Sequence, residues 1–146
     1  MNNKQTAVII PCGFKKTKVL TKAQHLYQGP YFKMNLAWAL SVVDGSRVFI
    51  LSAKHGLLRL TDELDPYDLK MGQPGSIGAV EIKRQAQALK LDQMKLYAVG
   101  GSEYLFALKA AGLDFCAPIA GLSLGRSMQV LKRNMRKLPD WRLHEI

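Results

Sequence analysis

Continuous apolar runs along the chain predict its strands. Each run is rich in aliphatic and β-branched residues and ends at a glycine or shortly before one. The four runs are 6–13, 47–53, 95–101 and 114–121. Pro118 indicates an edge position for the last of them, because proline cannot donate a hydrogen bond to a neighbouring strand.

Helical spacing is found between and after these runs. The expected helices cover 22–26, 31–43, 79–91, 102–112 and 124–138. Gly29-Pro30 separates the first two, and Ser102 is the expected N-cap of the fourth. The last helix has the clearest pattern, because its apolar residues recur every three or four positions and form one stripe: Leu124, Met128, Leu131, Met135 and Leu138.

The alternation of strands and helices predicts a small α/β fold. We expect one domain over 1–146, with a mainly parallel sheet of about four strands flanked by helices. Ligands of such sheets bind beyond the carboxyl ends of the strands. This rule brings three segments to one edge, namely PCGFKK after the first strand, SAKHG after the second and VGGSEY after the third.

The charge of the chain indicates a polyanionic partner. The 146 residues include 21 Lys and Arg against 11 Asp and Glu, a net charge of +10. No acidic residue precedes Asp44, and the last 25 residues are also strongly basic. Nucleic acid is the commonest polyanion in a cell, and DNA is favoured over RNA, with a nucleotide as the other expected partner. The alternative is a basic surface that only faces solvent.

Other classes find no support in the sequence. No apolar run is long enough to cross a bilayer, and the amino-terminal segment does not resemble a signal peptide, so we expect no membrane association. Cys12 and Cys116 lack metal-site spacing and are expected to be buried free thiols in a cytoplasmic protein. No motif for a metal or other cofactor is present, so neither is expected, and the oligomeric state is left open.

Two glycine-containing turns are candidate binding segments. Cys12 and Gly13 are predicted binding residues of the first turn, and Gly13 permits a tight turn there. The charges of Lys15 and Lys16 that follow would suit a phosphate. The second turn leads from the third strand into a helix, whose first N–H groups attract anions, and consists of Gly100, Gly101 and Ser102. Each of these turns is also compatible with a loop that binds nothing.

The segment ILSAKHGLLRLTDELDPYDLKMG, residues 50–72, carries the candidate chemistry. Ser52 and Lys54 leave a buried strand at the edge where ligands bind. Asp65 precedes Pro66, which restricts the backbone and directs the carboxylate, and Tyr67 follows. Lys54 and Asp65 are therefore the predicted catalytic residues. The alternative is a surface loop in which Lys54 only pairs with an acid.

Several of these motifs resemble the YaaA peroxide-stress protein family. The resemblance rests on LSAKHGLL, DPYDLKMG, VIIPCGFKKT, SEYLFAL and GLSLGRSMQVLKRN. The Cys-Gly-x-x-Lys turn, Ala23, the stretch from Leu26 to Gly29, Phe32 and the stretch from Leu51 to Lys54 are more similar to short relatives from phages and mobile elements. The resemblance implies an α/β core, DNA binding and oxidative-stress protection, and for some relatives modification of bases in phage DNA. Position 55 is usually aromatic in that family and is His here, so no catalytic role is predicted for His55.

The leading hypothesis is a nucleic-acid-associated enzyme that acts on a base or nucleotide, at an N-glycosidic bond or by modifying the base. Tyr27 or Tyr67 would stack on the base, and Arg126 and Arg133 of the last helix would bind phosphates. The alternative is a non-catalytic DNA-binding or stress protein of the YaaA type. A cluster of acids beside the expected site favours the enzyme, because carboxylates repel phosphate.

Overall fold

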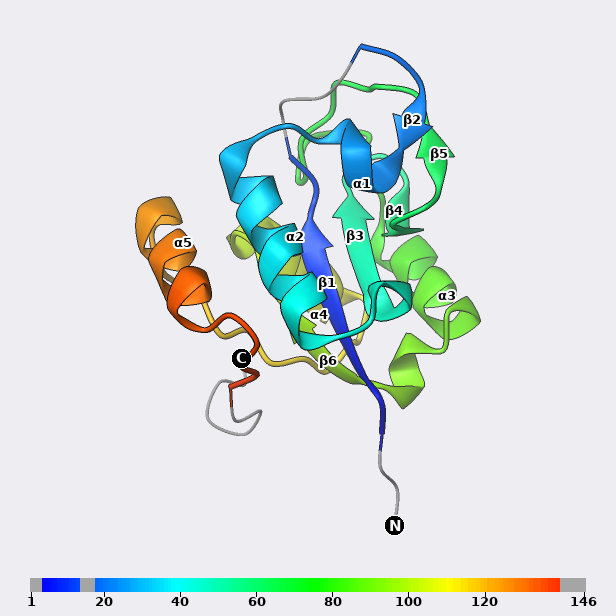
Figure 1. Cartoon of the computed structure of the whole chain (residues 1–146). Helices are drawn as coiled ribbons and strands as arrows, with labels where there is room; N and C mark the ends of the chain where they lie inside the picture. The colour runs from blue at the N-terminus through cyan, green and yellow to red at the C-terminus, as the bar shows by residue number, and fades with distance from the viewer. Residues whose placement is uncertain (1–3, 14–17, 140–146) are drawn as a thin grey trace.

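Four strands form the central sheet in the order β4-β3-β1-β6 (Figure 1). This computed structural model describes residues 4–13 and 18–139. Strands β1 (Thr6–Pro11), β3 (Val48–Ser52) and β6 (Lys95–Ala98) run parallel, and β4 (Gly56–Arg59) runs antiparallel to β3. The expected small α/β fold with a mainly parallel sheet is confirmed.

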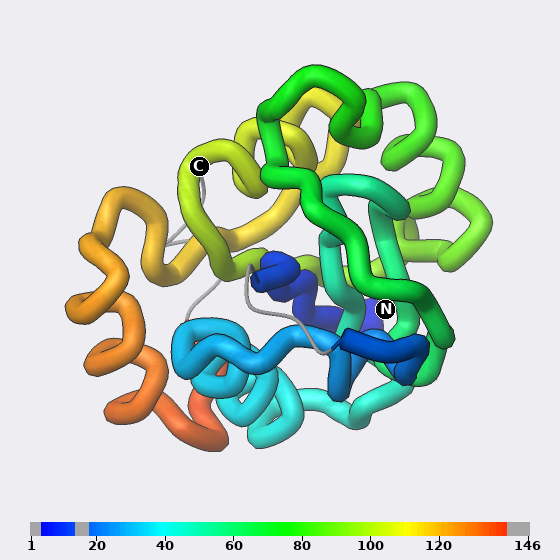
Figure 2. The backbone as a smooth tube through the Cα atoms, turned by 90° about the horizontal axis from the view of Figure 1, so that it is seen from above, coloured from blue at the N-terminus to red at the C-terminus, as the bar shows by residue number. Residues whose placement is uncertain are grey.

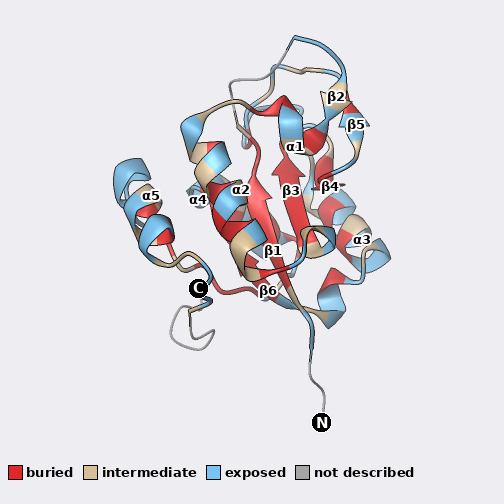
Figure 3. Ribbon diagram, viewed as in Figure 1, coloured by how far each residue is buried: buried red, intermediate tan, exposed pale blue. Residues whose placement is uncertain are grey.

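The two central strands lie in the core. Every residue of β3 is buried, and so is every residue of β1 after Thr6 (Figure 3). Parallel strands carry such unbroken apolar runs because helices cover both faces of the sheet. Helix α2 (Pro30–Val42) covers one face and packs against α5 (Leu124–Arg133), while α4 (Ser102–Ala110) lies behind the sheet and contacts α3 (Ala79–Ala88).

Short elements gather at the carboxyl ends of β1 and β3. Strands β2 (Thr21–Lys22) and β5 (Glu63–Leu64) pair antiparallel, and α1 (Ala23–Leu26) follows β2 directly. Two short 3-10 helices, η1 (Gly45–Arg47) and η2 (Leu91–Gln93), precede β3 and β6 at the opposite edge of the sheet. Figure 2 shows the segment between β5 and α3 crossing the carboxyl end of the sheet. Loops and short elements therefore cover this end of the sheet.

The predicted fourth strand, 114–121, is wrong as a strand. Only Cys116 pairs with the sheet, through one bridge to Tyr97, because the chain turns at Pro118. The fourth strand is instead β4, whose four residues follow the turn after β3 directly. The expected N-cap also moves by one residue, since Gly101 caps α4 and Ser102 is its first residue.

The last helix is shorter than its apolar stripe predicts. Helix α5 ends at Arg133, and Arg136 adopts a left-handed conformation with φ 64° that stops any continuation. The carbonyl of Asn134 accepts a hydrogen bond from Nε1 of Trp38 at 3.1 Å, which anchors this end to α2. Leu131 is buried, whereas Leu124 is 60% exposed, so only part of the stripe reaches the core.

Within residues 4–13 and 18–139, no helix combines the length and apolar character needed to cross a membrane.

Candidate functional site

Three hydroxyl groups form a hydrogen-bonded chain at the carboxyl end of β3. The hydroxyl of Tyr67 lies 2.7 Å from Oγ of Ser52 and 2.6 Å from the hydroxyl of Tyr27. Ser52 is the last residue of β3, Tyr27 follows α1, and Tyr67 lies in the segment after β5. The chain thus joins three parts of the fold at the edge where ligands of α/β sheets bind.

The hydrogen bonds of Ser52 indicate which group donates in its bond to Tyr67. Its Oγ accepts hydrogen bonds from the backbone N–H groups of Lys54 and His55, at 3.2 and 3.0 Å. These two bonds occupy both lone pairs of the serine oxygen, so its own proton is donated to Tyr67. The hydroxyls of Tyr67 and Tyr27 share the next hydrogen bond, at 2.6 Å.

Burial keeps these phenols neutral. It is the main cause that raises the pKa of both Tyr27 and Tyr67 well above the ordinary tyrosine value. The nearby Cys12 raises both pKa values further. The hydroxyls therefore act as hydrogen-bonding groups at neutral pH and not as phenolates.

A second polar pair lies at the end of β1. Sγ of Cys12 lies 3.1 Å from the hydroxyl of Tyr104 on α4, and the same hydroxyl donates to the carbonyl of Cys12 at 3.3 Å. Cys12 is buried, and burial is also the main cause of a raised pKa for Tyr104. The predicted binding residue Cys12 thus has a polar partner that sequence reasoning did not name as a site residue. The only sequence feature that pointed to Tyr104 was the Glu-Tyr pair at the start of α4.

An open cleft of about 520 Å³ lies beside the hydroxyl chain, between the turn after β3 and the β2–β5 ribbon. Its walls combine three leucines with five polar or charged residues, and the complete lining is Leu20, Lys54, His55, Leu58, Asp62, Glu63, Leu64 and Asp65. Both predicted catalytic residues, Lys54 and Asp65, line this one cleft, and both are exposed. The structure therefore brings them to the same place, although eleven positions separate them in sequence.

The carboxylates of the cleft differ in their surroundings. Oδ2 of Asp62 accepts a hydrogen bond from the backbone N–H of Arg59 at 2.8 Å, so this acid closes the turn between β4 and β5. Glu63 lies opposite Lys22 in the β2–β5 ribbon. Asp65 follows the ribbon and is exposed. Asp62 thus has a structural role in the turn, whereas Asp65 is an exposed residue of the cleft lining.

The remaining predicted residues do not line the cleft. Gly13 packs beside Tyr27 and Phe32 on the first strand's side, and Gly100, Gly101 and Ser102 follow β6, which β1 separates from β3. Arg126 and Arg133 are exposed on α5, which packs against α2. Lys15 and Lys16 lie outside the described residues. His55, for which no catalytic role was predicted, lines the cleft, and the sequence analysis missed Gln85, whose side chain bonds to the turn that carries His55.

Within the described ranges, no group of three or more His, Cys, Asp or Glu side chains is arranged to hold a metal ion.

The sequence model of a family of unknown function (DUF6884) matches residues 7–133. The chain belongs to that family. The match runs from β1 to the end of α5, so the DUF6884 region contains both the hydroxyl chain and the cleft. No curated protein and no solved structure matches the chain. The resemblance to YaaA proteins stays a prediction.

Proposed function

We propose that this DUF6884 protein is a nucleic-acid-associated enzyme that acts on a base or nucleotide at its N-glycosidic bond. The observation that supports this most is the meeting of Lys54 and Asp65 in one cleft of about 520 Å³. This volume lies within the roughly 300–1,000 Å³ of typical small-molecule sites. The cleft also lies at the sheet edge where such sites form.

The lining of the cleft favours the base and sugar over the phosphate. Its leucines offer apolar walls for a ring, and its carboxylates can accept hydrogen bonds from amino and hydroxyl groups. Three carboxylates against one lysine would repel a phosphate. The phosphates would stay outside, near the exposed Lys18 and Lys22, which flank the lining residue Leu20 in the chain.

The proposed reaction is hydrolysis of the N-glycosidic bond. The oxygen of a water molecule bonds to C1′ as the bond from C1′ to the base nitrogen breaks, and the base leaves with the bonding electron pair. The carboxylate of Asp65 stabilises the positive charge that develops on the sugar. The ammonium group of Lys54 donates a hydrogen bond to the departing base. The products are the free base, which gains one proton from the water, and a sugar with a hydroxyl group at C1′.

A second candidate is a non-catalytic DNA-binding protein. The basic residues of α5 favour it, since Arg126, Lys132 and Arg133 are all exposed and no acidic residue occurs between Phe115 and Pro139. Such a surface fits a phosphate backbone in either function. The two candidate functions therefore make different predictions for the cleft and the same prediction for α5. Either one fits a cytoplasmic protein, in which the buried thiols of Cys12 and Cys116 stay reduced.

Release of free base from oligonucleotides and nucleosides tests the proposal. Lys54→Ala and Asp65→Asn should each lower the rate at least about 100-fold while DNA affinity stays nearly constant. Lys95→Ala and Asp92→Asn are matched controls, because both residues are exposed at the opposite edge of the sheet. DNA binding without base release by the wild type would favour the second candidate. Unchanged turnover in both cleft variants would remove Lys54 and Asp65 from the mechanism.

A further inference from the structure

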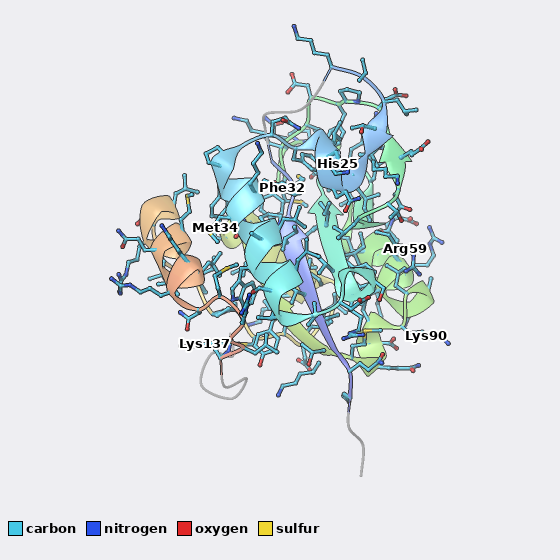
Figure 4. The ribbon with its side chains drawn as sticks, in the orientation of Figure 1. His25, Phe32, Met34, Arg59, Lys90 and Lys137 are labelled. Carbon is cyan, nitrogen blue, oxygen red and sulfur yellow. The ribbon has the colours of Figure 1, made fainter. Side chains whose placement is uncertain are left out.

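His55 lies in the turn between β3 and β4 and lines the cleft together with Lys54 and Asp65. It is half-buried, so its ring is partly shielded and still borders the cleft. The only other described histidine, His25, is exposed on α1 and does not line the cleft (Figure 4). His55 is thus the imidazole that a ligand in the cleft would meet.

The backbone of His55 is fixed from two sides. Its N–H donates to Oγ of Ser52 at 3.0 Å, and its carbonyl accepts from Nε2 of Gln85 at 2.9 Å. Oε1 of Gln85 also accepts from the N–H of Leu57 at 2.8 Å. Gly56 lies between these bonds with φ 76°, and a Cβ there would overlap the amide of Gln85. The side chains of Ser52 and Gln85 therefore both stabilise this turn.

The ring of His55 is fixed as well. It packs edge-to-face on the ring of Tyr67, with 5.5 Å between the centroids and 89° between the planes. The hydroxyl of Tyr67 is bonded to Ser52 and Tyr27. The same serine thus fixes the backbone of His55 directly and its ring through Tyr67. Ordering by both routes places the imidazole without a further loss of side-chain entropy when a ligand binds.

His55 is poised to accept a proton near neutral pH. Burial lowers the pKa of His55 below its ordinary value, and the charge of Lys54 lowers it further. The other charged groups of the cleft are the carboxylates of Asp62, Glu63 and Asp65, while the neutral Tyr67 and Gln85 pack on the remaining sides. The neutral imidazole is therefore the prevailing form above the ordinary histidine pKa of about 6.5.

We propose that His55 is the proton acceptor of the cleft, with Ser52, Tyr67 and Gln85 as its positioning residues. This role rests on the proposed hydrolysis and adds to it the group that activates water. As the water oxygen bonds to C1′, a ring nitrogen of His55 takes a water proton and becomes imidazolium. The imidazolium then returns that proton to the nitrogen of the departing base, so His55 ends the cycle neutral.

Two measurements on the full chain test this role. In the base-release assay, His55→Gln should lower kcat at least about 100-fold with KM nearly unchanged. It should also remove the fall in kcat on acidification, which the wild type should show only below the ordinary histidine pKa of about 6.5. His25→Gln is the matched control and should leave the rate and the pH profile unchanged. Gln85→Glu keeps the acceptor for Leu57 but lacks the donor to His55, so it should lower kcat, not KM, and shift the pKa of His55.

The imidazole NMR signals supply a readout that does not depend on turnover. Addition of the four deoxynucleosides should shift the His55 signal and not that of His25. A His55→Gln variant with the wild-type rate would overturn the role of His55 while the proposed hydrolysis stands. Base release absent from the wild type, together with a shifted His55 signal, would overturn both the hydrolysis and the proton-acceptor role and leave His55 as a ligand contact only. With neither base release nor a shift, both proposals are wrong.

Discussion

The hydroxyl of Tyr67 lies 2.7 Å from Oγ of Ser52, although fifteen positions separate the two residues. This bond ties the segment after β5 to the last residue of a fully buried strand. Asp65 lies two residues before Tyr67, and Lys54 lies two residues after Ser52. The bond therefore fixes the distance between the two walls of the cleft that carry the predicted catalytic groups.

Loss of the Tyr67 hydroxyl should destabilise the fold. Tyr67→Phe removes one partner from the fully buried Ser52 and one from Tyr27, and should lower the free energy of unfolding by about 1–3 kcal/mol. Urea unfolding of Tyr67→Phe, Ser52→Ala and the double variant measures the coupling, which should be at least about 0.5 kcal/mol. Strictly additive effects would mean that the two hydroxyls are not bonded.

The turn after β3 should not tolerate a side chain at position 56. Gly56→Ala combines a left-handed backbone with overlap of the Gln85 amide, and should cost more than about 2 kcal/mol. Gly75 is the matched control, because its φ is 93° and a Cβ there meets nothing within 4 Å. Gly75→Ala should cost only about 1 kcal/mol. Equal costs in denaturant unfolding would show that Gln85 does not crowd Gly56.

Alkaline pH should destabilise the protein through its buried phenols. The pKa values of Tyr27, Tyr67 and Tyr104 are raised in the fold, so the folded state keeps protons that the unfolded chain loses above pH ~10. The free energy of unfolding should therefore fall as pH rises through that value. Urea unfolding between about pH 9 and pH 11 measures the decline, and Tyr67→Phe should make it shallower. An identical pH dependence in that variant would contradict the raised pKa of Tyr67.

The arginines of α5 should carry salt-dependent DNA binding. Arg126→Gln with Arg133→Gln should weaken binding to duplexes of any sequence and reduce the slope of log affinity against log salt by about 1 for each lost phosphate contact. Lys83→Gln, an exposed lysine of α3, is the control and should leave the slope unchanged. Fluorescence anisotropy across a range of salt concentrations provides the measurement. An unaltered slope in the α5 variant would place the DNA-binding surface elsewhere.

The fold was predictable where one hydrophobic pattern, continuous or helical, corresponded to one strand or helix. Strands β1, β3 and β6 and helices α2, α3 and α4 begin and end within a few residues of the positions that hydrophobic pattern and glycine predict. Strand β4 was not predictable from its pattern, because Gly56–Arg59 follows a polar turn and pairs only through the hairpin with β3. The strand predicted at 114–121 is wrong although its pattern is apolar. This segment is joined to the sheet by a single bridge, at Cys116, and then turns.

The site was only partly predictable. The rule for strand ends brought Ser52 and Lys54 to the edge where ligands bind, and the structure places Tyr67 of the following segment beside Ser52. The same rule grouped Gly100 to Ser102 with the cleft, but sequence does not give strand order, and β1 lies between. The contribution of Gln85 depends on two side-chain hydrogen bonds that span 30 and 28 positions, which no local pattern reveals.

Mapping of backbone amide shifts by NMR tests the central claim most directly, namely that the cleft is the ligand site. A short single-stranded oligodeoxynucleotide added to the labelled protein should shift the amides of Lys54, His55 and Asp65 as well as those of α5. Lys54→Ala should weaken the shifts of the cleft and leave those of α5 unchanged. Shifts confined to α5, with the cleft amides unmoved at saturation, would contradict the account.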